Sequence, residues 1–170
     1  WGRQHDLVTL EQVAFNRSAA EITSIGGYAG GATNPPSGHL CYYNAKNDSI
    51  YSDLGSAEVV QIEVPEMRLD AVFRTYFRSF VQIDTHIWAR EDEFDVGPGY
   101  RAVLGFPGGI GNAAVMAELR KENVHNMTFR AGHGSDADTF GTNTIFILDS
   151  MTHPFFQAEL CLQFHNNQTG

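Results

Sequence analysis

A carboxyl group begins the apolar face of a predicted strand. Residues 57–64 read Ala-Glu-Val-Val-Gln-Ile-Glu-Val. A strand alternates its side chains with a period of two, which puts Val60, Ile62 and Val64 on one face. Glu58 begins that face, and we expect the face to pack on the core. Because burial penalises a charged carboxylate, Glu58 needs a hydrogen-bond partner or a chemical role.

The other motifs give weaker evidence of a chemical function. The segment 106–114, Phe-Pro-Gly-Gly-Ile-Gly-Asn-Ala-Ala, is rich in glycine like a phosphate-binding loop, but it lacks the lysine and the later acid that such loops use. It is better interpreted as a turn that begins a helix. Asp136 and Asp138 stand two residues apart, but the rest of a calcium loop is missing. The seven histidines form no zinc pattern, and no Gly-x-Ser-x-Gly motif marks a nucleophilic serine. We therefore predict neither a metal nor a cofactor.

Helices and strands are predicted to alternate around these residues. Helices are predicted over 10–20, 65–80, 112–123 and 154–165, and strands over 21–28, 57–64, 100–106, 127–130 and 144–148. The polar stretch 32–56 is predicted to be a long surface loop. This order indicates an α+β fold, a two-layer sandwich with a mixed sheet and a βαββαβ core, in a single domain over 1–170.

Composition excludes several partners. The chain has 170 residues, of which 42% are hydrophobic, and a formal net charge of −9. An acidic chain is a poor ligand for a phosphate backbone, so we expect no nucleic-acid partner. No apolar run approaches the roughly 20 residues that a membrane-spanning helix needs.

Sequons and cysteines predict an extracellular location. Asn-x-Ser/Thr occurs at Asn16, Asn47, Asn126 and Asn167, and we expect N-linked glycans on these residues. An oxidising compartment would favour one disulfide between the two cysteines, Cys41 and Cys161, although each could also be a small buried apolar residue. The first residue is Trp1, so we interpret the chain as a processed product or a fragment.

Four short segments form an ordered pattern along nearly the whole chain. They are Gly27-Tyr28-Ala29-Gly30-Gly31 with Asn34-Pro35, then Gly55-Ser56-Ala57-Glu58-Val59-Val60, then Asp95-Val96-Gly97-Pro98-Gly99-Tyr100-Arg101, and last Phe155-Phe156-Gln157-Ala158-Glu159-Leu160-Cys161-Leu162-Gln163. Together they resemble the peptide methionine sulfoxide reductase A family. The pattern of that family runs G-C-F-W-G, G-Y-x-G-G, N-P-x-Y, G-H-A-E, D-x-G-x-x-Y-R and F-x-x-A-E-x-x-H-Q.

The resemblance implies a ferredoxin-like core and a particular chemistry. In the family a thiolate at the start of the first helix attacks the sulfoxide sulfur, a buried acid and tyrosine hydroxyls polarise the sulfoxide oxygen, and a Phe-Trp pair surrounds the methyl group. Carried over by position, the acid is Glu58, a second carboxylate is Asp95, and one tyrosine is Tyr100.

Other positions depart from the family pattern. An ungapped count back from Gly27 places Leu7 at the nucleophilic cysteine, whereas matching Trp1-Gly2 to the family's W-G needs an insertion and places the cysteine before the first residue. The departures elsewhere are Ser37 for the tyrosine of N-P-x-Y, Ser56 for the histidine of G-H-A-E, and Leu162 for the histidine of A-E-x-x-H-Q. Without the thiol no sulfenic intermediate can form.

Three functions follow as hypotheses. The first is a secreted, N-glycosylated, non-catalytic protein that acts as an extracellular structural or interaction module, such as a repeating unit of an assembly, by self-association or with other extracellular proteins. In it Cys41 and Cys161, which border the family's cleft, would close that cleft with a disulfide. The alternative is an active reductase whose cysteine precedes Trp1. A third keeps Glu58 and Tyr100 as a binding site for a small polar ligand without catalysis.

Overall fold

The computed structural model describes residues 2–43, 49–92 and 94–164. Its α-helices are α1 (Gly2–Ala14), α2 (Leu69–Arg78) and α3 (Ala113–Glu122), with short 3-10 turns η1 (Ala19–Glu21), η2 (Glu66–Arg68), η3 (Pro98–Tyr100), η4 (Gly109–Gly111) and η5 (Leu160–Leu162). The strands are β1 (Ile25–Ala29), β2 (Leu40–Cys41), β3 (Ser49–Ile50), β4 (Ala57–Gln61), β5 (Phe80–Asp84), β6 (Ile87–Arg90), β7 (Val103–Phe106), β8 (Thr128–Ala131), β9 (Thr144–Asp149) and β10 (Phe156–Gln157).

The predicted α+β class is confirmed. β1 lies between β10 and β4 in an antiparallel sheet, and β9 lies between β7 and β8 in a parallel sheet. A hairpin, β5–β6, and a short parallel pair, β2–β3, complete the strands that the structure describes. The hydrogen-bonded strands are thus divided among small sheets, where the βαββαβ prediction had one mixed sheet.

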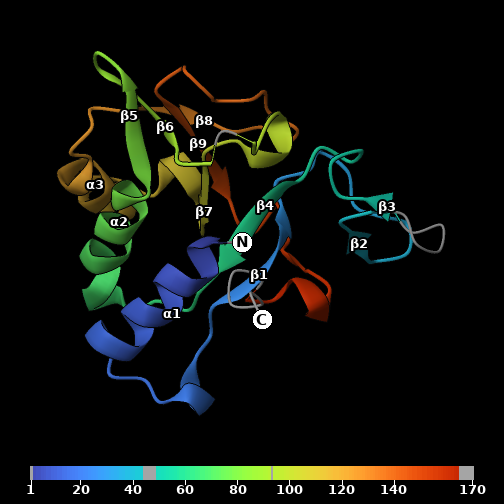
Figure 1. Ribbon diagram of the computed structural model, residues 1–170, viewed down its shortest axis with the longest axis horizontal. Coiled ribbons are helices and arrows are strands. Elements are labelled where there is room, and N and C mark those ends of the chain that lie inside the picture. Colours follow the sequence, from blue (N-terminus) through green and yellow to red (C-terminus); the bar gives the residue numbers. More distant parts are fainter. Residues whose placement is uncertain (1, 44–48, 93, 165–170) are drawn as a thin grey trace.

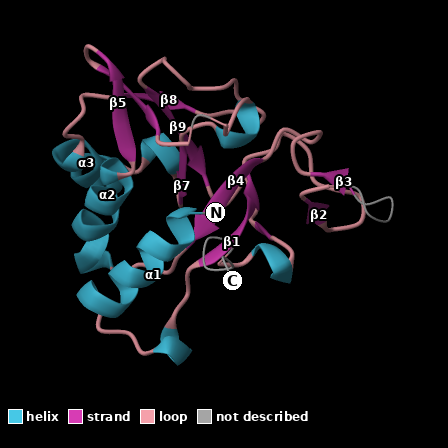
Figure 2. Ribbon diagram, viewed as in Figure 1, coloured by secondary structure: helices cyan, strands magenta, loops and turns pink. Residues whose placement is uncertain are grey.

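The three α-helices lie toward the left in Figures 1 and 2, and the β2–β3 pair extends at the far right. α2 packs against both α1 and α3. The main core cluster joins α2 and α3 to the parallel sheet through Phe73, Phe77, Phe80, Met116, Leu119, Met127, Ile145 and Ile147. A second cluster, Tyr28, Leu40, Tyr51 and Ala158, joins β1 to the loop segments around it.

The first helix differs from the prediction over 10–20. It begins at Gly2 and ends at Ala14 because Asn16 adopts a left-handed conformation (φ 55°), which is typical of the residue just after a helix. The Arg17 N–H then donates to the Glu11 carbonyl (3.0 Å) and closes the last turn. The Glu11 carboxylate is fully buried, where it accepts hydrogen bonds from the Thr23 and Ser24 N–H groups and ties the helix to the entry of β1.

The prediction of a C-terminal helix over 154–165 is wrong. Phe156 and Gln157 form β10 by pairing with Tyr28 and Gly27 of β1, and between β10 and residue 164, where the described residues end, η5 is the only helical turn. Pairing with a distant strand here outweighs the local helical pattern. The hairpin β5–β6 was not predicted at all.

The loop predicted over 32–56 contains more structure than expected. β2 and β3 pair within it, and Tyr51 at its end is buried (4% exposed). The Tyr51 N–H donates to the Cys41 carbonyl (3.0 Å), and the Ser56 N–H donates to the Tyr51 carbonyl (2.9 Å). These bonds fix Tyr51 beside the start of β4.

Candidate functional site

Glu58 lies in β4, directly across from Tyr28 of β1. Its side chain is half-buried, and the Tyr51 hydroxyl donates to its carboxylate Oε1 at 3.2 Å. The expected partner of this acid therefore exists, but it comes from the loop that was predicted to lie on the surface.

Tyr51 is the middle ring of a stack of three tyrosines. Its ring lies 4.7 Å from that of Tyr28 and 5.7 Å from that of Tyr42, both nearly parallel to it. The Tyr42 hydroxyl lies 3.0 Å from the Tyr100 hydroxyl, close enough for a hydrogen bond. Three tyrosine hydroxyls, those of Tyr42, Tyr51 and Tyr100, are thereby linked to the surroundings of Glu58.

Glu159 contacts this stack from the C-terminal segment, and Gln163 of the same segment contacts β1. The Glu159 carboxylate accepts the Tyr28 hydroxyl (2.7 Å) and the Tyr42 N–H (2.8 Å). The Gln163 side-chain amide accepts the Gly26 N–H and donates to the Gly26 carbonyl, both at 2.9 Å. Both residues belong to the A-E-x-x-H-Q-like segment, and in this structure their side chains position other groups.

An ion pair positions Asp95 and Tyr100. Arg90 forms a two-point contact with the Asp138 carboxylate (2.9 and 3.2 Å) and donates to the backbone carbonyls of Asp95 and Tyr100. Asp138 also accepts the N–H of Gly97, whose φ of 97° favours glycine. Asp138, half of the aspartate pair noted in the sequence, therefore serves as a structural anchor.

Burial controls the protonation of the site. It raises the pKa of Glu58 to about 7, and the nearby Asp95 carboxylate adds to this effect, while hydrogen bonds from Tyr51 and Tyr100 oppose it. Burial also raises the pKa of Asp95, with a further contribution from Asp92. The pKa values of Tyr51 and Tyr100 are raised above their usual range for the same reason, so both hydroxyls keep their protons.

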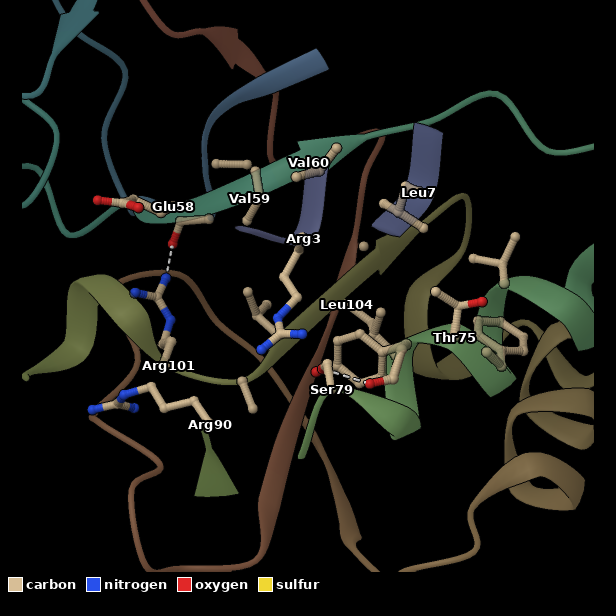
Figure 3. Close-up of a pocket in the computed structure, with 18 of the residues that line it drawn as sticks. Arg3, Leu7, Glu58, Val59, Val60, Thr75, Ser79, Arg90, Arg101 and Leu104 are labelled. Atoms are coloured by element: carbon tan, nitrogen blue, oxygen red, sulfur yellow. Dashed lines mark hydrogen bonds between the residues drawn. The ribbon is translucent and has the colours of Figure 1, made fainter. Parts of the chain in front are cut away.

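Glu58, Asp95 and Tyr100 line one cavity of about 1390 Å³, and so do Gly2 and Arg3 at the start of α1. Arg3 extends from α1 into this cavity, with Glu58 toward one end and Leu104 and Ser79 on the opposite side (Figure 3). The structure thus brings all three predicted site residues together beside the N-terminal turn of the first helix.

Leu7 is one of the two positions that the resemblance offers for the nucleophile. Leu7 lines the cavity but lies five residues inside α1, whereas the resemblance requires a group at the helix start. None of the described residues that line the cavity is a cysteine.

The two cysteines are not joined by a disulfide in this structure. Cys41 is half-buried in β2, and Cys161 is exposed in η5. Their segments are nevertheless connected, because the Tyr42 N–H donates to Glu159. The disulfide between them stays a prediction.

The three residues that depart from the family pattern, Ser37, Ser56 and Leu162, make structural contacts in this chain. Ser37 is exposed and bonds the backbone of His39, so it does not reach the site. Ser56 is buried beside the loop end, and Leu162 packs on the cluster around Tyr28. Tyr42 and Tyr51 supply the hydroxyls, and sequence reasoning missed them. The signal available was the concentration of tyrosines between the Gly-Gly turn and β4.

The glycine-rich segment forms a turn that begins a helix, as predicted. The turn is η4, and at the helix start the Asn112 side chain accepts the Val115 N–H (3.2 Å). Across residues 2–43, 49–92 and 94–164, no cluster of His, Cys, Asp and Glu is suited to a metal ion. No helix in this part of the chain is long and apolar enough to cross a membrane.

The sequons can be placed only in part. Asn16 and Asn126 are exposed, each in a left-handed conformation after a helix. Asn47 and Asn167 lie outside the described residues. Exposure of Asn16 and Asn126 leaves both open to modification.

Comparisons of the chain with protein-family models, with curated proteins and with solved structures gave no match. The chemistry of the site must therefore be argued from its own groups. A carboxyl group that holds its proton near neutral pH, together with tyrosine hydroxyls, forms a cluster of hydrogen-bond donors. Such a cluster suits a ligand with a strongly accepting oxygen.

Proposed function

We propose that the cluster of Glu58, Tyr51, Tyr42 and Tyr100 binds the oxygen of a sulfoxide, as in the peptide methionine sulfoxide reductase A family that the sequence resembles. The observation that carries this proposal is the hydrogen bond between Tyr51 and a Glu58 carboxyl whose pKa is raised to about 7. A sulfoxide oxygen is a strong hydrogen-bond acceptor. The protonated Glu58 carboxyl and the tyrosine hydroxyls can donate hydrogen bonds to it while they stay uncharged.

Reduction requires a thiol beside this cluster. In the reaction a cysteine thiol attacks the sulfoxide sulfur, the oxygen passes to the cysteine as a sulfenic acid, and the substrate leaves as a thioether. Two molecules of an external thiol then reduce the sulfenic acid, which releases water and a disulfide. α1 begins at Gly2, and Gly2 shares the cavity with Glu58, so the proposal puts the cysteine two residues before Trp1, near the start of that helix.

The test compares two chains. One is the 170-residue chain, and the other carries Gly-Cys-Phe ahead of Trp1; both receive methionine sulfoxide and dithiothreitol. We expect turnover only in the extended chain, with a loss of roughly 10²- to 10⁴-fold when Glu58→Gln removes the proton donor. An extended chain that binds methionine sulfoxide but does not reduce it would contradict the reductase function.

A second candidate is the non-catalytic extracellular module. It is favoured by the observation that no cysteine is among the described residues lining the cavity. In this function the cluster would contribute to structure or binding only, and the chain would associate with itself or with other extracellular proteins.

Intact mass of the secreted protein before and after glycosidase treatment tests the glycans, with Asn16→Gln and Asn126→Gln as site variants. Sedimentation of the same sample tests self-association.

A further inference from the structure

The hairpin β5–β6, at the upper left of Figure 1, has one strand that is open to solvent. β5 pairs with β6 along one edge, and among the residues that the structure describes no strand lies along its other edge. Phe80 at the start of β5 is buried, whereas the side chains from Val81 to Asp84 are exposed. A free strand edge with exposed apolar side chains is a template for pairing with another chain.

The backbone of Gln82 points toward this free edge. The Trp88 N–H of β6 points away from β5, because it donates to the side-chain oxygen of Asn143 (3.1 Å). Gln82 is the residue opposite Trp88, so the two form a pair that is not hydrogen-bonded across the hairpin. In such a pair both residues direct their N–H and carbonyl groups outward. Gln82 therefore offers one donor and one acceptor to an added strand.

An apolar groove lies beside β5. It has a volume of about 530 Å³, and its apolar lining consists of Val81, Ile83, Phe94 and Phe140. The exposed fractions of these residues run from 37% for Val81 to 85% for Phe94. Single exposed apolar residues are common on proteins, but a group that lines one groove indicates an interaction site.

The charged residues of the groove leave an excess of negative charge. They are Arg90, Glu91 and Asp92. Arg90 is neutralised by its two-point contact with Asp138. The Glu91 carboxylate lies 3.5 Å from Arg3, but its side chain is 70% exposed, and exposed pairs of this kind are weak. Two exposed carboxylates therefore border the apolar lining.

This charge decides which occupant fits the groove. A second copy of the chain carries the same carboxylates and a formal net charge of −9, so its β5 edge would bring acid beside acid. A basic segment gains attraction at the same place. We propose that the free edge of β5 and the groove bind an extended segment of another protein, one with apolar residues at alternate positions and with Lys or Arg next to them.

Each part of the groove has a role in this complex. The backbone of the segment pairs with Gln82, its apolar side chains fill the groove beside Val81 and Ile83, and its basic side chains lie near Glu91 and Asp92. The site is separate from the Glu58 carboxyl and does not rest on the proposed binding of a sulfoxide.

Three end-blocked peptides test the inference by calorimetry with the 170-residue protein. They are acetyl-Lys-Val-Thr-Val-Lys-amide, its counterpart with Glu in place of Lys, and the lysine peptide with methylated backbone nitrogens. We expect the lysine peptide to bind at least about tenfold more tightly than the glutamate peptide, because of its charge. Methylation removes the backbone donors and should weaken binding about tenfold. Equal affinities of the three peptides, or no binding of the lysine peptide at about 1 mM, would overturn the inference.

Matched variants distinguish the groove from general attraction to an acidic protein. Val81→Thr should weaken binding of the lysine peptide about three- to tenfold, because it removes apolar surface from the groove. Val124→Thr makes the same change at an exposed residue that does not line the groove and should have no effect. Glu91→Gln should also weaken binding, whereas Glu66→Gln, an equal change of net charge at another exposed position, should not. Equal effects within either pair of variants would contradict the inference.

Hydrogen exchange and sedimentation identify what occupies the groove. The bound lysine peptide should slow exchange of the Gln82 N–H, and unchanged exchange of this proton would rule out strand pairing. Sedimentation of the protein without peptide should show no dimer that depends on Ile83. A dimer that Ile83→Thr dissociates would assign the groove to a second copy of the chain and overturn the inference.

Discussion

The Tyr51 hydroxyl donates to the Glu58 carboxylate at 3.2 Å, and the two residues come from a loop and from the strand that follows it. This bond joins the Glu58 carboxylate to the stack of tyrosine rings. The pKa of Glu58 therefore depends on the position of the Tyr51 hydroxyl.

The stability of the protein should depend on pH through Glu58. Burial raises the pKa of Glu58 from 4.5 to about 7, so the folded state binds this proton more tightly than the unfolded state does. The stabilisation is therefore fully present below pH 4.5 and is lost as the pH rises toward 7. Urea unfolding across this window should show a smaller decline in Glu58→Gln than in the wild type. Parallel pH profiles for the two proteins would contradict this prediction.

Tyr51→Phe should raise the pKa of Glu58 further. Desolvation is the main cause of the raised pKa, and the Tyr51 hydrogen bond opposes it by stabilising the carboxylate. Removal of the hydroxyl leaves the aromatic stack in place but withdraws that opposition. The carboxyl stretching bands of isotope-labelled glutamate, followed by infrared titration, report the change. A lower pKa of Glu58 in Tyr51→Phe would show that this hydroxyl does not act on the carboxylate.

Glu11→Gln should destabilise the protein by about 2–3 kcal/mol, because it replaces charged hydrogen bonds at a fully buried site. Burial alone would raise the pKa of Glu11, but hydrogen bonds from Ser24, Thr23 and Arg17 outweigh it and lower the pKa below 4.5. The loss should thus be present above pH 4.5 and disappear as the pH falls through that lowered value. Denaturant unfolding of both proteins above pH 4.5 and in acid, below the lowered pKa of Glu11, measures this loss of stability. A loss that persists in acid would show that the charge of Glu11 is not its source.

Asp138→Asn should loosen the segment that carries Asp95 and Tyr100. The change weakens the two-point contact with Arg90 and should cost about 1–3 kcal/mol of unfolding free energy. Faster hydrogen exchange at the Gly97 N–H, which Asp138 accepts, would locate the effect. Asp70→Asn is the control, because it breaks an exposed pair with Arg74 and should change stability little. Equal effects of the two variants would contradict the anchoring role.

A disulfide between Cys41 and Cys161 should form when the protein is secreted. Closing a loop of roughly 120 residues would stabilise it by about 4–5 kcal/mol in the chain-entropy model. Cys41→Ser and Cys161→Ser should therefore lower the Tm by the same amount in oxidised samples and leave it unchanged in reduced ones. Two thiols that react with an alkylating reagent in non-reduced secreted protein would exclude the bond.

The sequence predicted the acid of the site better than its partners. Glu58 could be predicted because strand periodicity is local, whereas Asp95 and Tyr100 were predicted only because the resemblance to the family pattern carries over to their segment. Tyr42 and Tyr51 could not, since their positions depend on the pairing of β2 with β3 and on stacking between distant segments. The same reason explains β10, where contact with β1 determines the conformation of Phe156.

The side-chain amide of Gln163 imitates a peptide group. It meets both the N–H and the carbonyl of Gly26, as a neighbouring strand would, although it stands 137 positions away in the chain. The Gly26 amide proton is therefore a reporter for docking of the segment that carries Gln163. Any event that displaces that segment, whether cleavage or a competing partner, would expose this proton of β1 to exchange with solvent.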